Sequence, residues 1–210
     1  MSDKLANIGN LVLLINLILY GKYLFKLNKA FKIYTFYLLF ILLVQTYSFV
    51  LASQNKNNLF LSHFYFVGQF ILLSYFYLEI LKFKMQQLTV KIGFVICLLI
   101  LAAQYSSDFT LINKFNLFEI FITSFLIIIY SVFYLYNLLN EKKQFYYINI
   151  GLLLYLFGST ILFLVGNLTI ILSPKINKFT WMLNSSLYIV YQLFIFVEWK
   201  KSFSKNNLKS

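Results

Sequence analysis

Long apolar runs alternate with short polar joints along the chain. Seven runs approach or exceed the roughly 20 residues that a helix needs to cross a bilayer. They cover residues 7–25, 31–52, 59–81, 89–105, 111–139, 145–172 and 179–199. The joints are short enough for antiparallel neighbours. This pattern predicts an all-α integral membrane protein, an antiparallel bundle of about seven transmembrane helices within residues 1–199, with a basic tail at 200–210.

Composition supports this class. Hydrophobic residues make up 61% of the chain and charged residues 11%, against about 25% charged in soluble domains. A formal charge of +12 would favour nucleic acid if the lysines formed one face of a soluble domain. Here they lie between apolar runs, so we expect the lipid bilayer, and no nucleic acid, as the partner.

The lysines predict the orientation, because positively charged loops are retained in the cytoplasm. The joints after the first, third and fifth runs, and the tail, hold 13 of the 18 lysines: Lys22, Lys26, Lys29, Lys32, Lys82, Lys84, Lys91, Lys142, Lys143, Lys200, Lys201, Lys205 and Lys209. The opposite side holds Lys4, Lys56, Lys114, Lys175 and Lys178. We therefore expect the N-terminus outside and the C-terminus in the cytoplasm of a bacterial inner membrane. The start has no basic region typical of a cleaved signal peptide, so the first run is expected to be retained.

Two ionisable residues lie inside predicted spans near their outer ends. Glu119 lies in the fifth run, where a charged carboxylate costs about 2.5–3.5 kcal/mol at the bilayer centre. It is interpreted either as a proton- or ligand-responsive group or as an interfacial carboxylate reaching towards Lys114. His63, the one histidine, lies at a comparable depth in the third run. The two could meet and sense protons or hold a ligand; alternatively, His63 is half-buried and bonded to a backbone carbonyl.

Uncharged polar and small residues recur on single helix faces. One set, a candidate ligand- or proton-sensing surface or a packing surface, comprises Tyr65 and Gln69 in the third run, beside Ser62, and Asn184, Tyr188 and Gln192 in the seventh. Asn16 and Gln45 could join either polar network. In the sixth run Gly151, Tyr155 and Gly158 are spaced for close helix packing, with Ser159 and Gly166 on the same row.

Several kinds of chemistry are not supported. A single cysteine, Cys97, cannot form a disulfide framework, and one histidine without a cysteine partner does not predict zinc. No cofactor motif is present, and no catalytic residue is predicted. Glu79 and Glu198 are expected to form interfacial ion pairs near Lys82 and near Lys200 and Lys201. The one proline, Pro174, is expected in a joint, so no span is predicted to be broken.

The last third of the chain, from Phe145 onwards, carries a resemblance to a known family. Its features are Gly151-x-x-x-Tyr155-x-x-Gly158, then Trp181-Met-Leu-Asn184 and the run to Glu198-Trp199-Lys200. This stretch resembles the membrane sensor region of Bacteroidetes histidine kinases, in which a multi-helix module precedes a cytoplasmic kinase. The printed sequence holds no phosphoacceptor segment or ATP-binding domain. The resemblance therefore implies a stand-alone membrane sensor or accessory module in a two-component system, acting with a separate histidine kinase or response regulator.

Two other functions remain as alternatives. An integral membrane lipid-metabolising enzyme of the lysoplasmalogenase-like kind has a similar length and helix count. Such an enzyme would need several acidic residues that converge in the bundle, and Glu119 alone lies well inside. A small-solute or proton carrier is supported only by the polar residues that recur on single helix faces.

Overall fold

The computed structural model describes residues 2–26, 28–139, 143–169 and 174–203, and these residues form helices and joints with no strand. The chain divides into two compact units. The first comprises Met1–Tyr23 with Tyr134–Ser210, and the second Leu24–Phe133. Each unit is described by itself.

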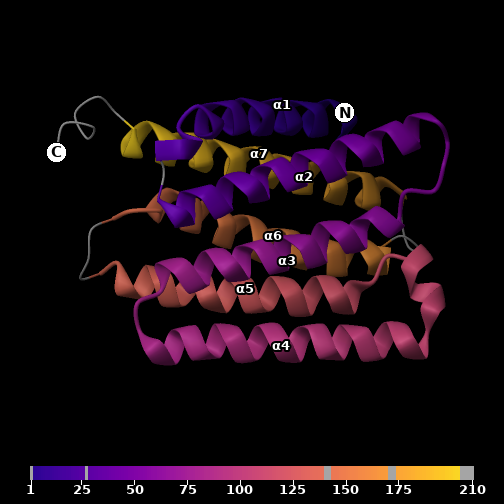
Figure 1. Cartoon of the computed structure of the whole chain (residues 1–210). Helices are drawn as coiled ribbons and strands as arrows, with labels where there is room; N and C mark the ends of the chain where they lie inside the picture. Colours follow the sequence, from indigo (N-terminus) through magenta and orange to yellow (C-terminus); the bar gives the residue numbers. More distant parts are fainter. Residues whose placement is uncertain (1, 27, 140–142, 170–173, 204–210) are drawn as a thin grey trace. The chain divides into compact units, whose positions relative to one another are not determined.

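The second unit contains the short 3-10 helix η1 (Leu24–Lys26), α2 (Lys29–Ser53), α3 (Phe60–Ile80), α4 (Lys84–Ser107), the 3-10 helix η2 (Phe109–Asn113) and α5 (Leu117–Asn137), whose last turn is counted with the first unit. Helix α2 packs along α3 (Figure 1), and α3 also contacts α4. Asn28 begins α2, because its Oδ1 accepts from the Phe31 N–H at 3.0 Å and so satisfies a free donor of the first turn.

Aromatic side chains fill the core of the second unit. Tyr34, Phe76 and Tyr77 are fully buried, and their rings contact one another at angles that favour edge contacts over flat stacking. Gly68 of α3 lies directly against the ring of Phe40 on α2. The absence of a side chain at Gly68 therefore lets these helices approach closely.

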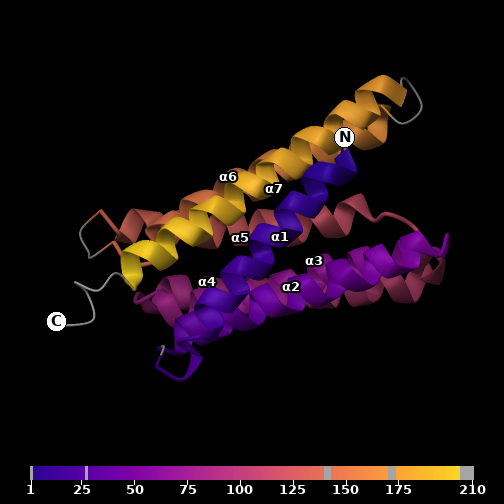
Figure 2. The same cartoon turned by 90° about the horizontal axis from the view of Figure 1, so that it is seen from above.

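The first unit consists of α1 (Ser2–Gly21), α6 (Tyr146–Thr169) and α7 (Pro174–Ser202). Helix α7 packs along α6 and also contacts α1 (Figure 2). The predicted row of small residues on α6 faces α7. A Cβ at Gly151 would meet Phe194, and one at Gly158 would meet Leu187. Between these glycines the Tyr155 ring stacks on Tyr191 at 5.4 Å.

The seven predicted runs correspond to seven helices of the described chain that are long and apolar enough to cross a membrane. Many of their large apolar side chains are exposed, among them Leu11, Leu99 and Phe157. Exposed apolar surface on this scale is typical of helices that face lipid. The fold is therefore all-helical and compatible with a multi-pass membrane protein.

Several predicted boundaries differ from the structure. The first run extends to residue 25, whereas α1 ends at Gly21 and η1 follows. The fifth run begins at residue 111, but residues 109–113 form η2 and α5 begins at Leu117. The shortest run, the fourth, is a full helix of 24 residues. Residues 170–172 of the sixth run, and 204–210 of the tail, lie outside the described residues.

Two predictions for the end of the chain also differ from the structure. Pro174 was expected in a joint, but it is the first residue of α7. Proline is well suited to this position, because the first helical residue has no N–H partner within the helix. The predicted tail also overlaps α7, which continues through Lys200 and Lys201 to Ser202.

We expect Gly151→Ala to lower the melting temperature of the purified protein, because the new Cβ would lie 2.6 Å from Phe194 Cβ. Overpacking of this kind costs about 1–3 kcal/mol. Both tryptophans, Trp181 and Trp199, lie in α7, so their fluorescence follows the unfolding of this unit. Gly21→Ala is the matched control, because nothing lies within 4 Å of its added Cβ. Equal melting of the two variants would contradict the close α6–α7 contact.

Candidate functional site: a histidine–glutamate–tyrosine centre

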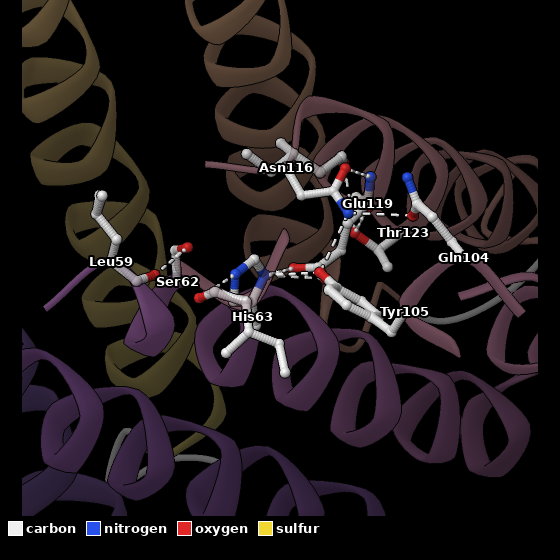
Figure 3. Close-up of polar contacts among 10 residues, drawn as sticks. Leu59, Ser62, His63, Gln104, Tyr105, Asn116, Glu119 and Thr123 are labelled. Carbon is white, nitrogen blue, oxygen red and sulfur yellow. Dashed lines mark hydrogen bonds and ion pairs between the residues drawn. The ribbon is translucent and has the colours of Figure 1, made fainter. Parts of the chain in front are cut away.

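Three helices of the second unit bring ionisable side chains together at one end (Figure 3). His63 comes from the first turn of α3, Tyr105 from the last turn of α4 and Glu119 from the first turn of α5. His63 Nδ1 lies 3.2 and 3.1 Å from Glu119 Oε1 and Oε2, and 2.8 Å from the Tyr105 hydroxyl. The Tyr105 hydroxyl also donates to Glu119 Oε2. We call His63, Tyr105 and Glu119 the polar centre.

The local sequence places Glu119 at the start of α5. Asn116 immediately precedes the helix, and its Oδ1 accepts from the Glu119 N–H at 3.3 Å, which caps the first turn. Asn116 Nδ2 donates to the Tyr105 hydroxyl and to Gln104 Oε1, each at 3.1 Å. One amide therefore connects the end of α4 to the beginning of α5. Glu119 is free to turn towards His63 because Asn116 already caps the helix.

The hydrogen bonds define how many protons the polar centre holds. His63 Nε2 lies 3.1 Å from the Ile112 carbonyl; a carbonyl only accepts, so Nε2 carries a proton. Nδ1 faces both carboxylate oxygens of Glu119. This contact fits an imidazolium beside a carboxylate, or a neutral imidazole that accepts from a protonated carboxyl. In both, one proton lies between Nδ1 and Glu119. The Tyr105 hydroxyl, 2.8 Å from Nδ1, is a second donor available to a neutral ring.

Removal of this shared proton would leave two acceptors facing each other. The Nδ1 lone pair would then lie about 3.1 Å from a charged carboxylate oxygen, in surroundings where Glu119 is 1% and the His63 side chain 12% exposed. An unpaired buried acceptor is costly, about 1–3 kcal/mol and more for a charged group. The contact is therefore stable with the proton and unstable without it.

His63 makes both of the contacts considered for it. The ring is largely buried and bonded to a backbone carbonyl, and it also meets Glu119. The carbonyl belongs to Ile112 in η2, which is part of the joint between α4 and α5. The polar centre is thus attached to this joint through His63 Nε2.

The charged groups of the joint, Asp108 and Lys114, both bond to Thr110. Asp108 Oδ1 accepts from Thr110 Oγ1 at 2.7 Å and from the Thr110 N–H at 3.0 Å. These hydrogen bonds, with a smaller contribution from Lys114, hold the pKa of Asp108 below its usual value. The Lys114 ammonium donates to Thr110 Oγ1 at 2.9 Å. Glu119 is oriented towards His63 and Tyr105, which does not support the predicted reach towards Lys114.

The remaining candidates of α3 occupy different surroundings. Gln69 is buried, and its Oε1 accepts from the Tyr37 hydroxyl at 3.1 Å. Tyr65 is partly exposed and contacts the Phe66 ring. Gln69 therefore contributes to packing between α2 and α3. These contacts of Gln69 and Tyr65 do not involve the polar centre.

The candidates of α7 belong to the first unit. Asn16 Nδ2 donates to the Gln192 carbonyl at 2.9 Å and to Gln192 Oε1 at 3.0 Å, which ties α1 to α7. The Tyr188 ring packs on Tyr155. Asn184 is partly exposed, although its Oδ1 is buried without a hydrogen-bond partner. Packing explains Tyr188 and Gln192 without a ligand.

The expectation for Glu198 is wrong. It was expected in an interfacial ion pair, but it is 1% exposed, and its Oε1 and Oε2 accept from the Phe145 and Tyr147 N–H groups, each at 2.9 Å. It therefore satisfies free donors at the start of α6. Glu79 forms an ion pair, as expected, and a partner is Lys29 on α2 at 2.7 Å.

The sequence interpretation did not select Tyr105 of the polar centre or the bonding partners Asn116 and Ile112. The last two were missed because the fifth span was placed from residue 111 onwards. The pattern Asn116-Leu-Phe-Glu119 is a recognisable helix start, with a capping residue three positions before a glutamate. This signal would have moved the start of α5 and placed Glu119 in its first turn.

Comparisons with protein-family models, curated proteins and solved structures find no match to this chain. Within the described ranges, no three His, Cys, Asp or Glu side chains gather as metal ligands do. The polar centre must therefore be interpreted from its own hydrogen bonds and charges.

Glu119→Gln and Tyr105→Phe should be energetically coupled. Each change breaks the same hydrogen bond, so the double variant should lose about 1–3 kcal/mol less than the sum of the single losses. The free energy of unfolding, followed through Cys97 labelling in detergent, measures this difference. Tyr75→Phe is the control, because Tyr75 is 52% exposed and lies outside the polar centre. Additive losses for Glu119 and Tyr105 would argue against their hydrogen bond.

Asp108 should not titrate in the range where the polar centre is expected to respond. Since its pKa is lowered, the charged form stabilises the joint above the usual aspartate pKa of about 3.9. That contribution is lost as the pH falls through the lower folded value. We expect the amide resonance of Thr110 to shift only below about pH 4 and Asp108→Asn to abolish the shift. A shift between pH 5 and 8 that Asp108→Asn removes would refute this assignment.

Proposed function

We propose that the chain is a multi-pass protein of a bacterial inner membrane, with its N-terminus outside and its C-terminus in the cytoplasm. In this setting it acts as a stand-alone sensor or accessory module with a separate histidine kinase or response regulator. The observation that supports the proposal is the contact of His63 Nδ1 with both carboxylate oxygens of Glu119, at 3.2 and 3.1 Å, from which we infer a shared proton. In the proposed orientation the polar centre lies at the outer end of its unit.

The shared proton supplies a stimulus-dependent change. A sensor needs two arrangements that interact differently with the stimulus. With the proton, the ends of α3, α4 and α5 are held together through His63, Tyr105 and Glu119. Without it, Nδ1 and the carboxylate repel each other, which favours separation of these helix ends. Protons, or a ligand that competes for the same groups, would therefore shift the helix packing.

The joint between α4 and α5 would move with the polar centre. His63 donates to the Ile112 carbonyl, and Asn116 bonds to both Gln104 and Tyr105. Displacement of His63 would thus disturb η2 and the first turn of α5. The lysine-rich joints at the opposite ends of these helices would present the change to a cytoplasmic partner.

The geometry favours a sensor over an enzyme. In a catalytic histidine–carboxylate pair, one ring nitrogen contacts the carboxylate and the other faces the substrate. Here Nε2 is occupied by the Ile112 carbonyl. One carboxylate, Glu119, is present in the polar centre, where a lipid hydrolase was expected to bring several together. The polar centre therefore holds a proton but leaves no free base.

Hydrogen exchange provides the direct test. We expect residues 108–116 to exchange faster at pH 8 than at pH 5.5, after correction for intrinsic rates, because loss of the shared proton loosens the joint. His63→Gln should remove this pH dependence. Ser62→Ala, a change one residue away that leaves the polar centre intact, should retain it.

Association with a partner is the second half of the test. Tagged protein cross-linked in its native membranes should recover a histidine kinase or response regulator, with a yield that differs between pH 5.5 and pH 8. The His63→Gln variant should give the same yield at both. Failure to recover any such partner at either pH would refute the signalling role, even if the joint responds to protons.

A further inference from the structure

One end of the first unit joins three chain segments. The Tyr20 hydroxyl of α1 donates to the Ile195 carbonyl of α7 at 3.2 Å. Just beyond α1, the Tyr23 ring stacks on Phe203 at 5.2 Å with an interplanar angle of 10°. Glu198 of α7 accepts from the Phe145 N–H at the start of α6. The end of α1, the end of α7 and the start of α6 are therefore held at one place.

Exposed lysines accompany each of these segments. Lys22 lies between Tyr20 and Tyr23, Lys143 precedes α6, and Lys200 and Lys201 lie in the last turn of α7. Lys143 Nζ lies 5.3 Å from the centre of the Tyr146 ring, which is within the range of a cation–π contact. The segments thus gather positive charge that is spread along the sequence. We call Lys22, Lys143 and Lys200 the lysine cluster.

The carboxylate described at this end does not project among the lysines. Glu198 is buried, and its oxygens accept from the Phe145 and Tyr147 N–H groups and from the Ser202 hydroxyl. Its charge is directed into the start of α6, where the helix dipole also favours an anion. Glu198 therefore does not neutralise the exposed lysines of these segments.

Aromatic and apolar side chains lie next to this charge. Trp199 and Phe203 are in ring contact at 6.4 Å, and Trp199 also contacts Phe196. Along the same helix, towards its middle, Leu193 is half exposed. Along α7, lysines are followed by aromatic and then by apolar side chains. This order matches the phosphate, the glycerol region and the acyl chains of a phospholipid.

We propose that the lysine cluster binds the headgroup of an anionic phospholipid, with the lipid phosphate at the lysines and the acyl chains along the exposed apolar surface of α7. A free phosphate ion would gain the charge contacts alone. The adjoining aromatic and apolar surface therefore favours the lipid. This site is separate from the polar centre, and its test is independent of the signalling role.

Native mass spectrometry of the delipidated protein in a non-ionic detergent tests the site. The probes are phosphatidylglycerol, phosphatidylcholine and inorganic phosphate. We expect phosphatidylglycerol to bind more tightly than phosphatidylcholine, and millimolar inorganic phosphate not to displace it. Each lysine near an anionic headgroup contributes about fivefold in affinity. The triple variant Lys22→Gln, Lys143→Gln, Lys200→Gln should thus bind phosphatidylglycerol on the order of a hundredfold more weakly.

The control removes the same charge elsewhere. Lys4, Lys56 and Lys178 are also exposed, and their triple glutamine variant should bind phosphatidylglycerol within about twofold of the unchanged protein. Equal losses in the two triple variants would mean that net charge, not the lysine cluster, attracts the lipid, and would overturn the proposal. Equal binding of the two lipids, or displacement by inorganic phosphate, would overturn it as well. If circular dichroism shows that the triple variant is unfolded, Lys200→Gln alone decides, with an expected loss of about fivefold.

Discussion

A buried carboxylate must be matched by hydrogen-bond donors, and both units of this chain are organised around that requirement. Glu119 and Glu198 are each 1% exposed. Without donors, either charge would make its unit strongly unstable. Glu119 obtains its donors from α3 and α4, and Glu198 from the start of α6. Glu119 therefore joins the ends of α3, α4 and α5, and Glu198 joins α7 to the start of α6.

Sequence patterning alone predicts most of the fold. Apolar runs separated by short polar joints require no tertiary information, because each run satisfies its own backbone hydrogen bonds as a helix. The same reasoning fails at helix ends, where capping determines the boundary. Asn116 caps α5, which therefore begins at Leu117, six residues after the predicted residue 111. Helix α7 begins at Pro174, which was expected in the preceding joint.

The polar centre was predictable in part. His63 and Glu119 could be paired because their depths from the same predicted membrane face agree, and depth can be counted along a sequence. Tyr105 and the Ile112 carbonyl depend on the conformation of the α4–α5 joint, which no periodicity describes. Glu198 was misinterpreted for a related reason. Nearby lysines in the sequence favour an ion pair, but the donors that it uses belong to backbone groups 51 and 53 residues away.

The type of donor distinguishes the two carboxylates. Glu198 is held by backbone N–H groups, which carry their protons at any physiological pH, so its contacts do not change with the surroundings. Glu119 is held by an imidazole and a phenol, and an imidazole gains or loses a proton near neutral pH. Replacing a buried ion pair with apolar side chains often leaves the stability of a protein unchanged or raises it. Packing alone therefore gives little reason to keep an ionisable pair. Glu198 has a structural explanation in the backbone donors that begin α6. Glu119 has no structural explanation of this kind, because Asn116 already caps α5. For this reason the responsive role is assigned to the polar centre and not to the Glu198 contact.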